Sequence, residues 1–585
     1  MLKIFKKLTK KQILLVLISV IFITFQVFLD LKIPDYMNEI TKYVQTDGST
    51  MKDVLAPGVY MVLCAFGSLI SSVIVGYFAA YIAASFSKNL RKDVFAQVGK
   101  FGMEEIKKFS TSSLITRTTN DITQVGMLIS MGLQVIIKAP IMAVWAINKI
   151  IGKNFNWSIA TAVAIIVLLV MILLLVLVAL PKFKKIQWLT DNLNRITREN
   201  LTGIRVVRAY NAENYQNNKF EKANEELTST HLFTAKLMAI MSPTMNLIMS
   251  GLTLSIYFIG AYLINEANML DKINLFSDMV VFSAYAMQVV MSFMMLTMIF
   301  ILYPRASVAA KRIVEVLETE NNIKEGKKTS GIEKGTIEFK NVSFKYSDAE
   351  EYMLKDINFK AKKGETIAFI GRTGSGKSTI INLIPRLYDA TEGEVLVDGI
   401  NVKEYKEESL YNLIGYISQK AVMFRGTILD NVGLGKKNGQ KVSKDKMIKA
   451  IEVAQGKEFV EKLPDKYNYS LAEQGTNVSG GQKQRLSIAR AIARDPEIYI
   501  FDDSFSALDY KTDFTLRKEL KKYTKDATVV IVAQRIGTIK DADQIFVIED
   551  GEIVGSGTHK QLIKTCEEYK EIALSQLSKE EIENA

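Results

Sequence analysis

Cysteine is scarce in this chain, and its scarcity excludes two classes of protein. The 585 residues include two cysteines, Cys64 and Cys566, which lie far apart in the sequence. Two isolated cysteines provide neither a disulfide framework nor the ligand spacing of a metal site. At this length one hydrophobic core is also insufficient, so several domains are expected.

Charged residues are absent from long stretches of the first half of the sequence. Five uncharged runs reach or exceed the length of about 17–25 residues that lets an α-helix cross a bilayer; they are residues 13–29, 54–87, 158–180, 237–265 and 279–304. Another apolar stretch, 122–151, is interrupted by Lys138 and Lys149. The first run lacks a small-residue cleavage site, so we interpret it as a span and not as a signal peptide. The sequence therefore predicts a helical transmembrane domain of about six spans.

Basic residues are in excess, and their distribution follows the predicted membrane topology. The net charge is +12, and Lys and Arg gather in residues 88–117 and 182–219, whereas the loop at 35–53 is mostly acidic. Because cytoplasmic loops are rich in Lys and Arg, these two segments, the N-terminus and the C-terminal half are expected in the cytoplasm. Both segments favour helices that continue below the membrane and turn near residues 109–113 and 212–216. The charge thus indicates a cell-membrane protein and not a nucleic-acid binder.

A polar segment divides the chain. Residues 318–334 contain Lys, Glu, Asn and Gly without an apolar period, which is typical of a linker. We therefore predict a transmembrane domain over residues 1–317, a linker over 318–334 and a soluble domain over 335–585.

The soluble domain contains a glycine-rich loop that fits G-x-x-x-x-G-K-[ST] without a mismatch. A strand-like run precedes this loop and a helix-like run follows it, so backbone N–H groups and a helix N-terminus can surround phosphate oxygens. Lys377 is expected to reach the β- and γ-phosphates, and Ser378 to hold Mg²⁺. Upstream, Tyr346 could stack on a nucleobase, or it is an ordinary strand aromatic. The residues of the loop are Gly371, Arg372, Thr373, Gly374, Ser375, Gly376, Lys377 and Ser378.

Two further motifs follow the P-loop. Asp502 ends an apolar strand-like run, as does the acid that helps to hold Mg²⁺ in P-loop proteins. A second phosphate-binding element opens a helix-like segment; it consists of Ser479, Gly480, Gly481 and Gln482. One P-loop has no use for both elements on the same phosphate, whereas a second chain facing this one could use the extra element.

Together these motifs resemble the ATP-binding cassette (ABC) transporters, and the resemblance covers the whole chain. About six spans followed by one cassette look like a half-transporter of the exporter type, with an α/β P-loop domain that carries a helical subdomain. The resemblance implies that two cassettes sandwich two ATP molecules, each between one chain's P-loop and the other chain's residues 479–482. It also implies a catalytic and Mg²⁺-binding role for Gln419, and it assigns Thr379 and Asp509 to the nucleotide site.

Two residues depart from the family pattern. Asp503 stands where the family has Glu, and Gln534 stands where it has a switch-loop His. The shorter Asp side chain places its carboxylate ~1.5 Å further back, and a misplacement of ~1 Å can cost ~10²-fold in rate. Gln534 can donate a hydrogen bond but cannot carry positive charge. We therefore expect the P-loop site of this chain to bind ATP with Mg²⁺ and to hydrolyse it slowly.

This pattern resembles the degenerate-site subunits of heterodimeric bacterial multidrug-type exporters. In such a complex, residues 479–482 complete a competent site whose Glu and His belong to a partner half-transporter. Two alternatives stay open. One is a homodimeric exporter in which Asp503 supports slow hydrolysis, and the other is a membrane regulator or channel that ATP binding gates without pumping.

Two features of the spans concern the substrate. Lys138 is a charge within an apolar stretch, which marks a functional candidate or a side chain that snorkels to the inner surface. A stripe of methionines at helical spacing could line a permissive apolar cavity, although packing or lipid contact explains it as well; its members are Met287, Met291, Met294 and Met298. These features favour a hydrophobic small molecule, a lipid or a peptide as substrate.

Overall fold

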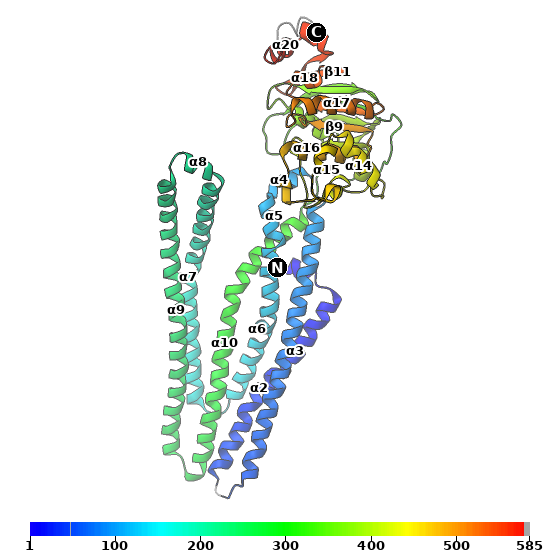
Figure 1. The fold of residues 1–585 in the computed structure, drawn as a ribbon. Coiled ribbons are helices and arrows are strands. Elements are labelled where there is room, and N and C mark those ends of the chain that lie inside the picture. Colours follow the sequence, from blue (N-terminus) through cyan, green and yellow to red (C-terminus); the bar gives the residue numbers. More distant parts are fainter. Residues whose placement is uncertain (47, 578–585) are drawn as a thin grey trace. The chain divides into compact units, whose positions relative to one another are not determined.

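The computed structural model describes residues 1–46 and 48–577, which separate into two compact units (Figure 1). The first unit comprises Met1–Gly99 and Ser112–Thr319, and the second comprises Lys100–Thr111 and the chain from Glu320 onward. The domain boundaries drawn from the sequence remain predictions. The observed division differs from them in one respect, because a segment from the first half of the chain belongs to the second unit.

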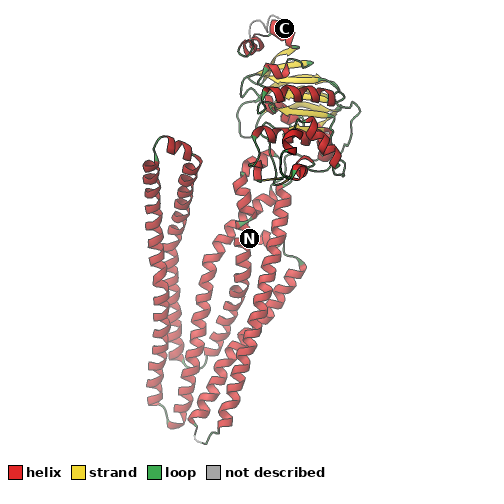
Figure 2. Ribbon diagram, in the orientation of Figure 1, coloured by secondary structure: helices red, strands yellow, loops and turns green. Residues whose placement is uncertain are grey.

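Long helices build the first unit (Figure 2). Within the described residues, six helices are long and apolar enough to cross a membrane, so the predicted number of spans is confirmed. They are α2 (Lys10–Gln45), α3 (Met51–Val98), α5 with α6 (Thr111–Thr118 and Asn120–Ile150), α7 (Phe155–Thr202), α9 (Glu213–Glu266) and α10 (Met269–Glu318). The unit also contains the short helices α1 (Leu2–Phe5) and α8 (Ile204–Ala209). The helices outrun their uncharged stretches because the flanking segments are rich in good helix formers such as Lys, Glu and Leu.

The spans pack mainly in pairs. Helix α2 packs against α3, α6 against α10, and α7 against α9. A buried cluster joins five of these helices, and in it the rings of Trp157 and Phe282 lie 5.4 Å apart. Many other apolar side chains, such as Leu173 and Phe258, are exposed on the outside of the unit. Apolar outer surfaces are expected for helices that lie in lipid.

The chain reverses direction between α3 and α6 and again between α7 and α9 (Figure 1). The first reversal lies in the predicted range, 109–113, where Ser110 adopts a positive φ of 59° immediately before α5. The second turn was predicted at 212–216, which is wrong, because most of that range already belongs to α9. The chain reverses earlier, since Gly203 ends α7 and Asn211 adopts a φ of 49° after α8.

Two sheets form the core of the second unit. The larger has six strands in the order β12-β11-β3-β10-β9-β6, parallel except for β12, and the smaller has four antiparallel strands in the order β2-β1-β4-β5. The central strands of the larger sheet, β3, β10 and β9, are nearly continuous apolar runs, as expected for parallel strands that are covered on both faces. The strands are β1 (Ile337–Phe344), β2 (Leu354–Ala361), β3 (Thr366–Ile370), β4 (Glu392–Val397), β5 (Ile400–Asn401), β6 (Ile414–Ile417), β9 (Ile498–Asp502), β10 (Thr528–Val532), β11 (Gln544–Glu549) and β12 (Glu552–Gly557). A small two-stranded ribbon pairs β7 (Gly426–Thr427) with β8 (Ser470–Leu471).

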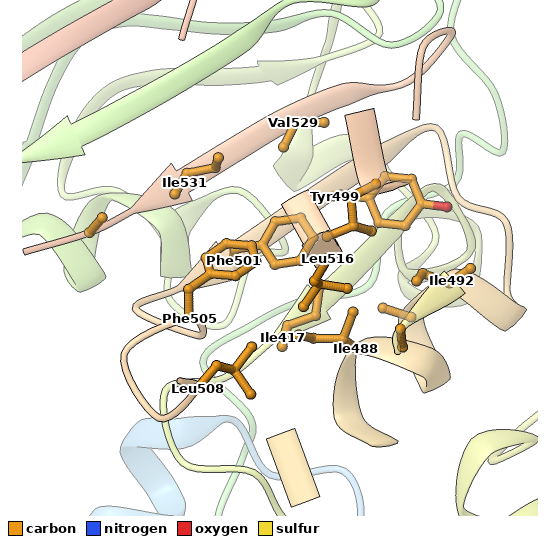
Figure 3. Close-up of a cluster of buried hydrophobic side chains, with 14 of the residues drawn as sticks. Ile417, Ile488, Ile492, Tyr499, Phe501, Phe505, Leu508, Leu516, Val529 and Ile531 are labelled. Atoms are coloured by element: carbon orange, nitrogen blue, oxygen red, sulfur yellow. The ribbon is translucent and has the colours of Figure 1, made fainter. Parts of the chain in front are cut away.

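Helices pack on the larger sheet and complete the fold of this unit. Figure 3 shows part of the buried core, where Tyr499 and Phe501 of β9 lie beside Ile488, Leu516 and Val529. The helices are α4 (Met103–Phe109), α11 (Lys377–Leu383), α12 (Glu407–Leu413), α13 (Ile428–Val432), α14 (Lys444–Val453), α15 (Lys457–Glu461), α16 (Gly480–Ala493), α17 (Tyr510–Tyr523), α18 (Ile536–Ile539), α19 (His559–Thr565) and α20 (Glu567–Leu574). A helical membrane unit joined to an α/β unit with extra helices confirms the predicted fold class.

Candidate nucleotide-binding site

The glycine-rich loop connects β3 to α11, as predicted. Gly371, Gly374 and Gly376 adopt φ values of 155°, 90° and 103°, which residues with a side chain rarely adopt. A Cβ atom at Gly371 would overlap the carbonyl oxygen of Ile548, and one at Gly376 would lie 2.7 Å from Cδ2 of Leu354. The loop therefore needs these glycines both for its conformation and for its close approach to neighbouring strands.

Lys377 lies inside the loop, with its side chain largely buried. Its ammonium donates hydrogen bonds to the carbonyl oxygens of Gly371, at 2.9 Å, and Arg372, at 2.6 Å. Burial lowers the pKa of Lys377, and the carboxylates of Asp503 and Asp502 counteract that shift. A partly desolvated cation held by a glycine loop is well suited to bind phosphate oxygens.

Ser378 and Asp502 meet at the end of β9. The Ser378 hydroxyl donates to Oδ1 of Asp502 at 2.8 Å, and the Tyr416 hydroxyl donates to Oδ2 at 3.4 Å. Burial raises the pKa of Asp502, while these two hydroxyl donors act in the opposite direction. A hydroxyl and a carboxylate side by side supply the hard oxygen ligands that Mg²⁺ prefers. This pair, which the sequence placed 124 positions apart, is the part of the site that fits a magnesium ion.

Asp503 is bracketed by two amides. Its Oδ2 accepts a hydrogen bond from Nε2 of Gln419 at 3.2 Å and another from Nε2 of Gln534 at 3.1 Å. Its backbone adopts a φ of 45° at the end of β9. Burial raises the pKa of Asp503, and the bond from Gln419 opposes that effect. The structure thus brings together the three residues that the sequence singled out, and it adds that both glutamines bind the same oxygen.

Tyr346 lies next to the first turn of α11. Its hydroxyl and that of Thr379 are 3.0 Å apart, so one donates to the other. The ammonium of Lys107, from α4, lies 5.5 Å from the Tyr346 ring centroid and 2.8 Å from the Asp348 carboxylate. Both partners of Lys107 belong to the same unit as α4. The sequence did not single out Lys107 as a partner of Asp348, which lies 241 positions further along the chain.

The second phosphate-binding element forms the start of α16. Ser479 is the N-cap, its Oγ accepts from the N–H of Gln482 at 3.3 Å, and Oε1 of Gln482 accepts from the N–H of Ser479 at 2.9 Å. This reciprocal pair is a capping box, which fixes the first turn of the helix. No atom lies within 4 Å of a Cβ atom built on Gly480, so the backbone there is accessible. Asp509 instead caps α17, where it accepts from the N–H of Thr512 at 3.0 Å.

The membrane residues proposed for substrate lie on two helices, Lys138 on α6 and the methionine stripe on α10. Lys138 forms an ion pair with Asp30 at 3.0 Å, and Ser68 donates to the same carboxylate at 2.5 Å. Met287 accepts a bond from the Thr253 hydroxyl at 3.8 Å, and Met294 packs against the buried cluster of the membrane unit. Two other methionines of the stripe face outward, since Met291 and Met298 are exposed.

Comparisons with known proteins cover both units. A family described as ABC transporter transmembrane region matches residues 16–293, and one described as ABC transporter matches residues 354–506. An uncharacterized ABC transporter ATP-binding protein of Mycobacterium tuberculosis is 38% identical over 519 residues, which is 88% of this chain and 87% of that protein. An ATP-dependent lipid A-core flippase of Haemophilus influenzae is 30% identical over 510 residues, 87% of this chain and 86% of that protein.

A solved structure shares the fold of the whole chain. It is that of a bacterial Atm1-family ABC exporter with ATP bound, and it superimposes with a TM-score of 0.81 over 97% of this chain and 100% of the other, at 21% identity. The matches over both regions and the identity to the relatives decide the family. The chain belongs to the ABC transporters, as an exporter-type half-transporter of the cell membrane whose ATPase is coupled to transport.

Proposed function

We propose that this chain is one half of a heterodimeric ABC exporter. Its own P-loop site binds Mg²⁺–ATP and hydrolyses it slowly, while its residues 479–482 complete the competent site of a different partner subunit. The observation that carries the proposal is the double hydrogen bond from Gln419 and Gln534 to one oxygen of Asp503.

That arrangement is a poor general base. A base must present a free lone pair within hydrogen-bond reach of the attacking water. In this chain Asp503 is one methylene shorter than Glu, and the lone pairs of its Oδ2 are directed at two amide N–H groups. Gln534 can donate to a γ-phosphate but cannot become a cation. Slow hydrolysis follows from both features, whereas binding of the phosphates and Mg²⁺ rests mainly on Lys377, Ser378 and Asp502.

The binding residues are complete. Lys377 supplies the cation for the phosphates, and Tyr346 supplies an aromatic face near the P-loop helix for the base. Ser378 and Asp502 would hold Mg²⁺, with Gln419 close by on Asp503. The ion would neutralise phosphate charge, and these residues would position it.

The start of α16 supports a role at a partner's site. Its capping box leaves the Gly480 backbone accessible, and a helix N-terminus favours a negatively charged phosphate. A competent site also needs a Glu and a His where this chain has Asp503 and Gln534. We therefore place that Glu and that His on a different half-transporter.

For the substrate we propose a hydrophobic or amphipathic molecule: a small drug-like compound, a lipid or a peptide. The membrane unit presents an apolar surface with exposed, flexible methionines such as Met291 and Met298, which suit varied apolar ligands. The Haemophilus relative is named for a lipid, which favours a lipid among these classes.

Subunit composition tests the heterodimer. The chain would be tagged, extracted gently from its own membranes and weighed intact with whatever accompanies it. We expect an equimolar second half-transporter with Glu and His in the places of Asp503 and Gln534. A pure homodimer with ATPase activity would contradict the proposal and favour slow hydrolysis at Asp503. A homodimer without ATPase activity would favour a regulator gated by ATP binding.

A further inference from the structure

The C-terminal segment contacts the loop that carries Gln534. Nε2 of Gln576 donates to the carbonyl oxygen of Gln534 at 2.7 Å, and Oε1 of Gln576 accepts from the N–H of Ile536 at 2.8 Å. One amide therefore binds two backbone groups on either side of Arg535. A planar group that bonds at both ends restricts the loop more than a single hydrogen bond does.

Gln576 is itself held in place by α20. Tyr569 and Ala573 of that helix are fully buried in the core of the second unit. The Tyr569 hydroxyl lies 2.7 Å from Nδ1 of His559, which ties α20 to α19. The N–H of Gln576 donates to the carbonyl oxygen of Ala573 at 3.1 Å. The Gln576 amide is therefore anchored through α20 to the core of the second unit.

Among the described contacts, the carbonyl oxygen of Gln534 and the N–H of Ile536 bond only to Gln576. Arg535 is the N-cap of α18 and makes no side-chain capping bond, so the N–H of Ile536 depends on Gln576. Further along, the guanidinium of Arg517 donates to the carbonyl oxygen of Gly537 at 2.9 Å, which anchors α18 independently. Removal of the Gln576 amide is therefore expected to release the Gln534 backbone and to leave α18 in place.

We propose that Gln576 is a positioning residue for the nucleotide site. It fixes the backbone at Gln534, and that backbone sets the side-chain amide 3.1 Å from Oδ2 of Asp503. The amide nitrogen of Gln534 carries a second N–H, which is available to donate to an oxygen of a γ-phosphate. The C-terminal segment thereby controls how long this chain retains ATP. The assignment rests on the function proposed for this chain's slow site.

Gln576→Met tests the assignment, because it keeps the length of the side chain and removes both hydrogen bonds. The assembled complex would be loaded with an azido analogue of ATP, and unlabelled ATP would then displace the analogue. Irradiation after increasing times would attach the analogue that is still bound, and its amount on each subunit would be measured by mass. We expect ATP to leave this chain about three to ten times faster, the range that a net hydrogen bond or two can supply. Release from the partner subunit is expected to stay unchanged.

Two comparisons separate positioning from a general loss of structure. Glu567→Gln is the matched control on α20, because Glu567 is exposed and, among the described contacts, its side chain makes none with the P-loop; we expect normal retention. In a Gln534→Ala background, Gln576→Met is expected to have no further effect, since it acts through Gln534. Unchanged retention in Gln576→Met, an equal effect of Glu567→Gln, or a full effect in the Gln534→Ala background would each overturn the assignment. If the sites of the two wild-type subunits hydrolysed ATP at equal rates, the slow site proposed for this chain would be contradicted, independently of the role of Gln576.

Discussion

The two phosphate-binding regions of the second unit differ in how their polar groups are engaged. Around the P-loop, the side chains bind one another: Ser378 donates to Asp502, and two glutamines donate to Asp503. At the start of α16, Ser479 bonds only within its own helix turn among the described contacts, and the backbone of Gly480 is accessible. The difference is the one expected if the chain keeps a surface for a partner's nucleotide while its own catalytic group is altered, as we propose.

Of the substitutions considered, Ser479→Ala should have the largest effect on the ATPase activity of the complex. If α16 completes the competent site, loss of the hydroxyl should lower ATPase activity of the assembled complex by about 10²-fold, as removal of one such donor does elsewhere. Steady-state phosphate release measures it. Because Ala also removes a helix cap worth about 1 kcal/mol, Ser479→Asn is the control: Asn caps equally well, so the melting temperature should hold while activity falls. Normal ATPase activity in both variants would contradict the role of α16 in a competent site.

Lys377→Ala should have a smaller effect on turnover. Loss of the ammonium should weaken ATP binding at this chain's site by about tenfold or more, because it removes a charge-assisted contact to phosphate. Turnover of the complex should fall only severalfold if hydrolysis occurs mainly at the other site, as we propose. Nucleotide binding to each subunit and phosphate release would be measured on the same preparation. A loss of turnover greater than that caused by Ser479→Ala would reverse the roles that we assign.

Asp503→Glu and Gln534→His together should raise ATP hydrolysis at this chain's own P-loop site. Glu alone restores the length of the base, but the Gln534 amide still occupies a carboxylate oxygen and supplies no charge. We expect the single variant to change hydrolysis at this site little and the double variant to raise it about tenfold. Subunit-resolved ADP formation reports it. Full recovery in Asp503→Glu alone would show that Gln534 does not limit the site.

Asp503→Asn should have the smallest effect. Burial raises the pKa of Asp503 above that of an ordinary aspartate, so a base at this position would lose activity as the pH falls through that raised pKa. If the competent base belongs to a partner subunit, as we propose, Asn should leave both the rate of the complex and its acid limb nearly unchanged. ATPase measured from neutral to mildly acidic pH checks it. An acid limb that vanishes in the variant would identify Asp503 as the working base.

Much of this molecule could be predicted from local patterns. Five uncharged runs and one apolar stretch with two lysines identified the six spans, because bilayer thickness sets helix length. The glycine loop identified the phosphate site because its conformation requires glycine at Gly371 and Gly376. Asp503 and Gln534 were recognisable as departures from a family pattern. The hydrogen bond from Gln534 to Asp503 was not recognisable, because these residues lie 31 positions apart and meet only in the folded sheet.

The contacts that escaped prediction all join distant parts of the chain. Gln576 lies 42 positions from Gln534, and the ion pair of Lys138 with Asp30 joins two different spans. The turn after α7 was misplaced for a local reason, since α8 is too short to leave a hydrophobic period. Segment α4 was assigned to the membrane half by its position, yet Lys107 and its neighbours pack within the second unit.

The most direct test of the division of labour is to identify the nucleotide that this chain holds during turnover. The complex would be photolabelled in the steady state with azido-ATP carrying the label on the α- or the γ-phosphate, and the two subunits would then be separated. We predict that both labels are found on this chain, because its ATP stays intact, and that only the α-label is found on the partner. Loss of the γ-label from this chain at the partner's rate would contradict the account.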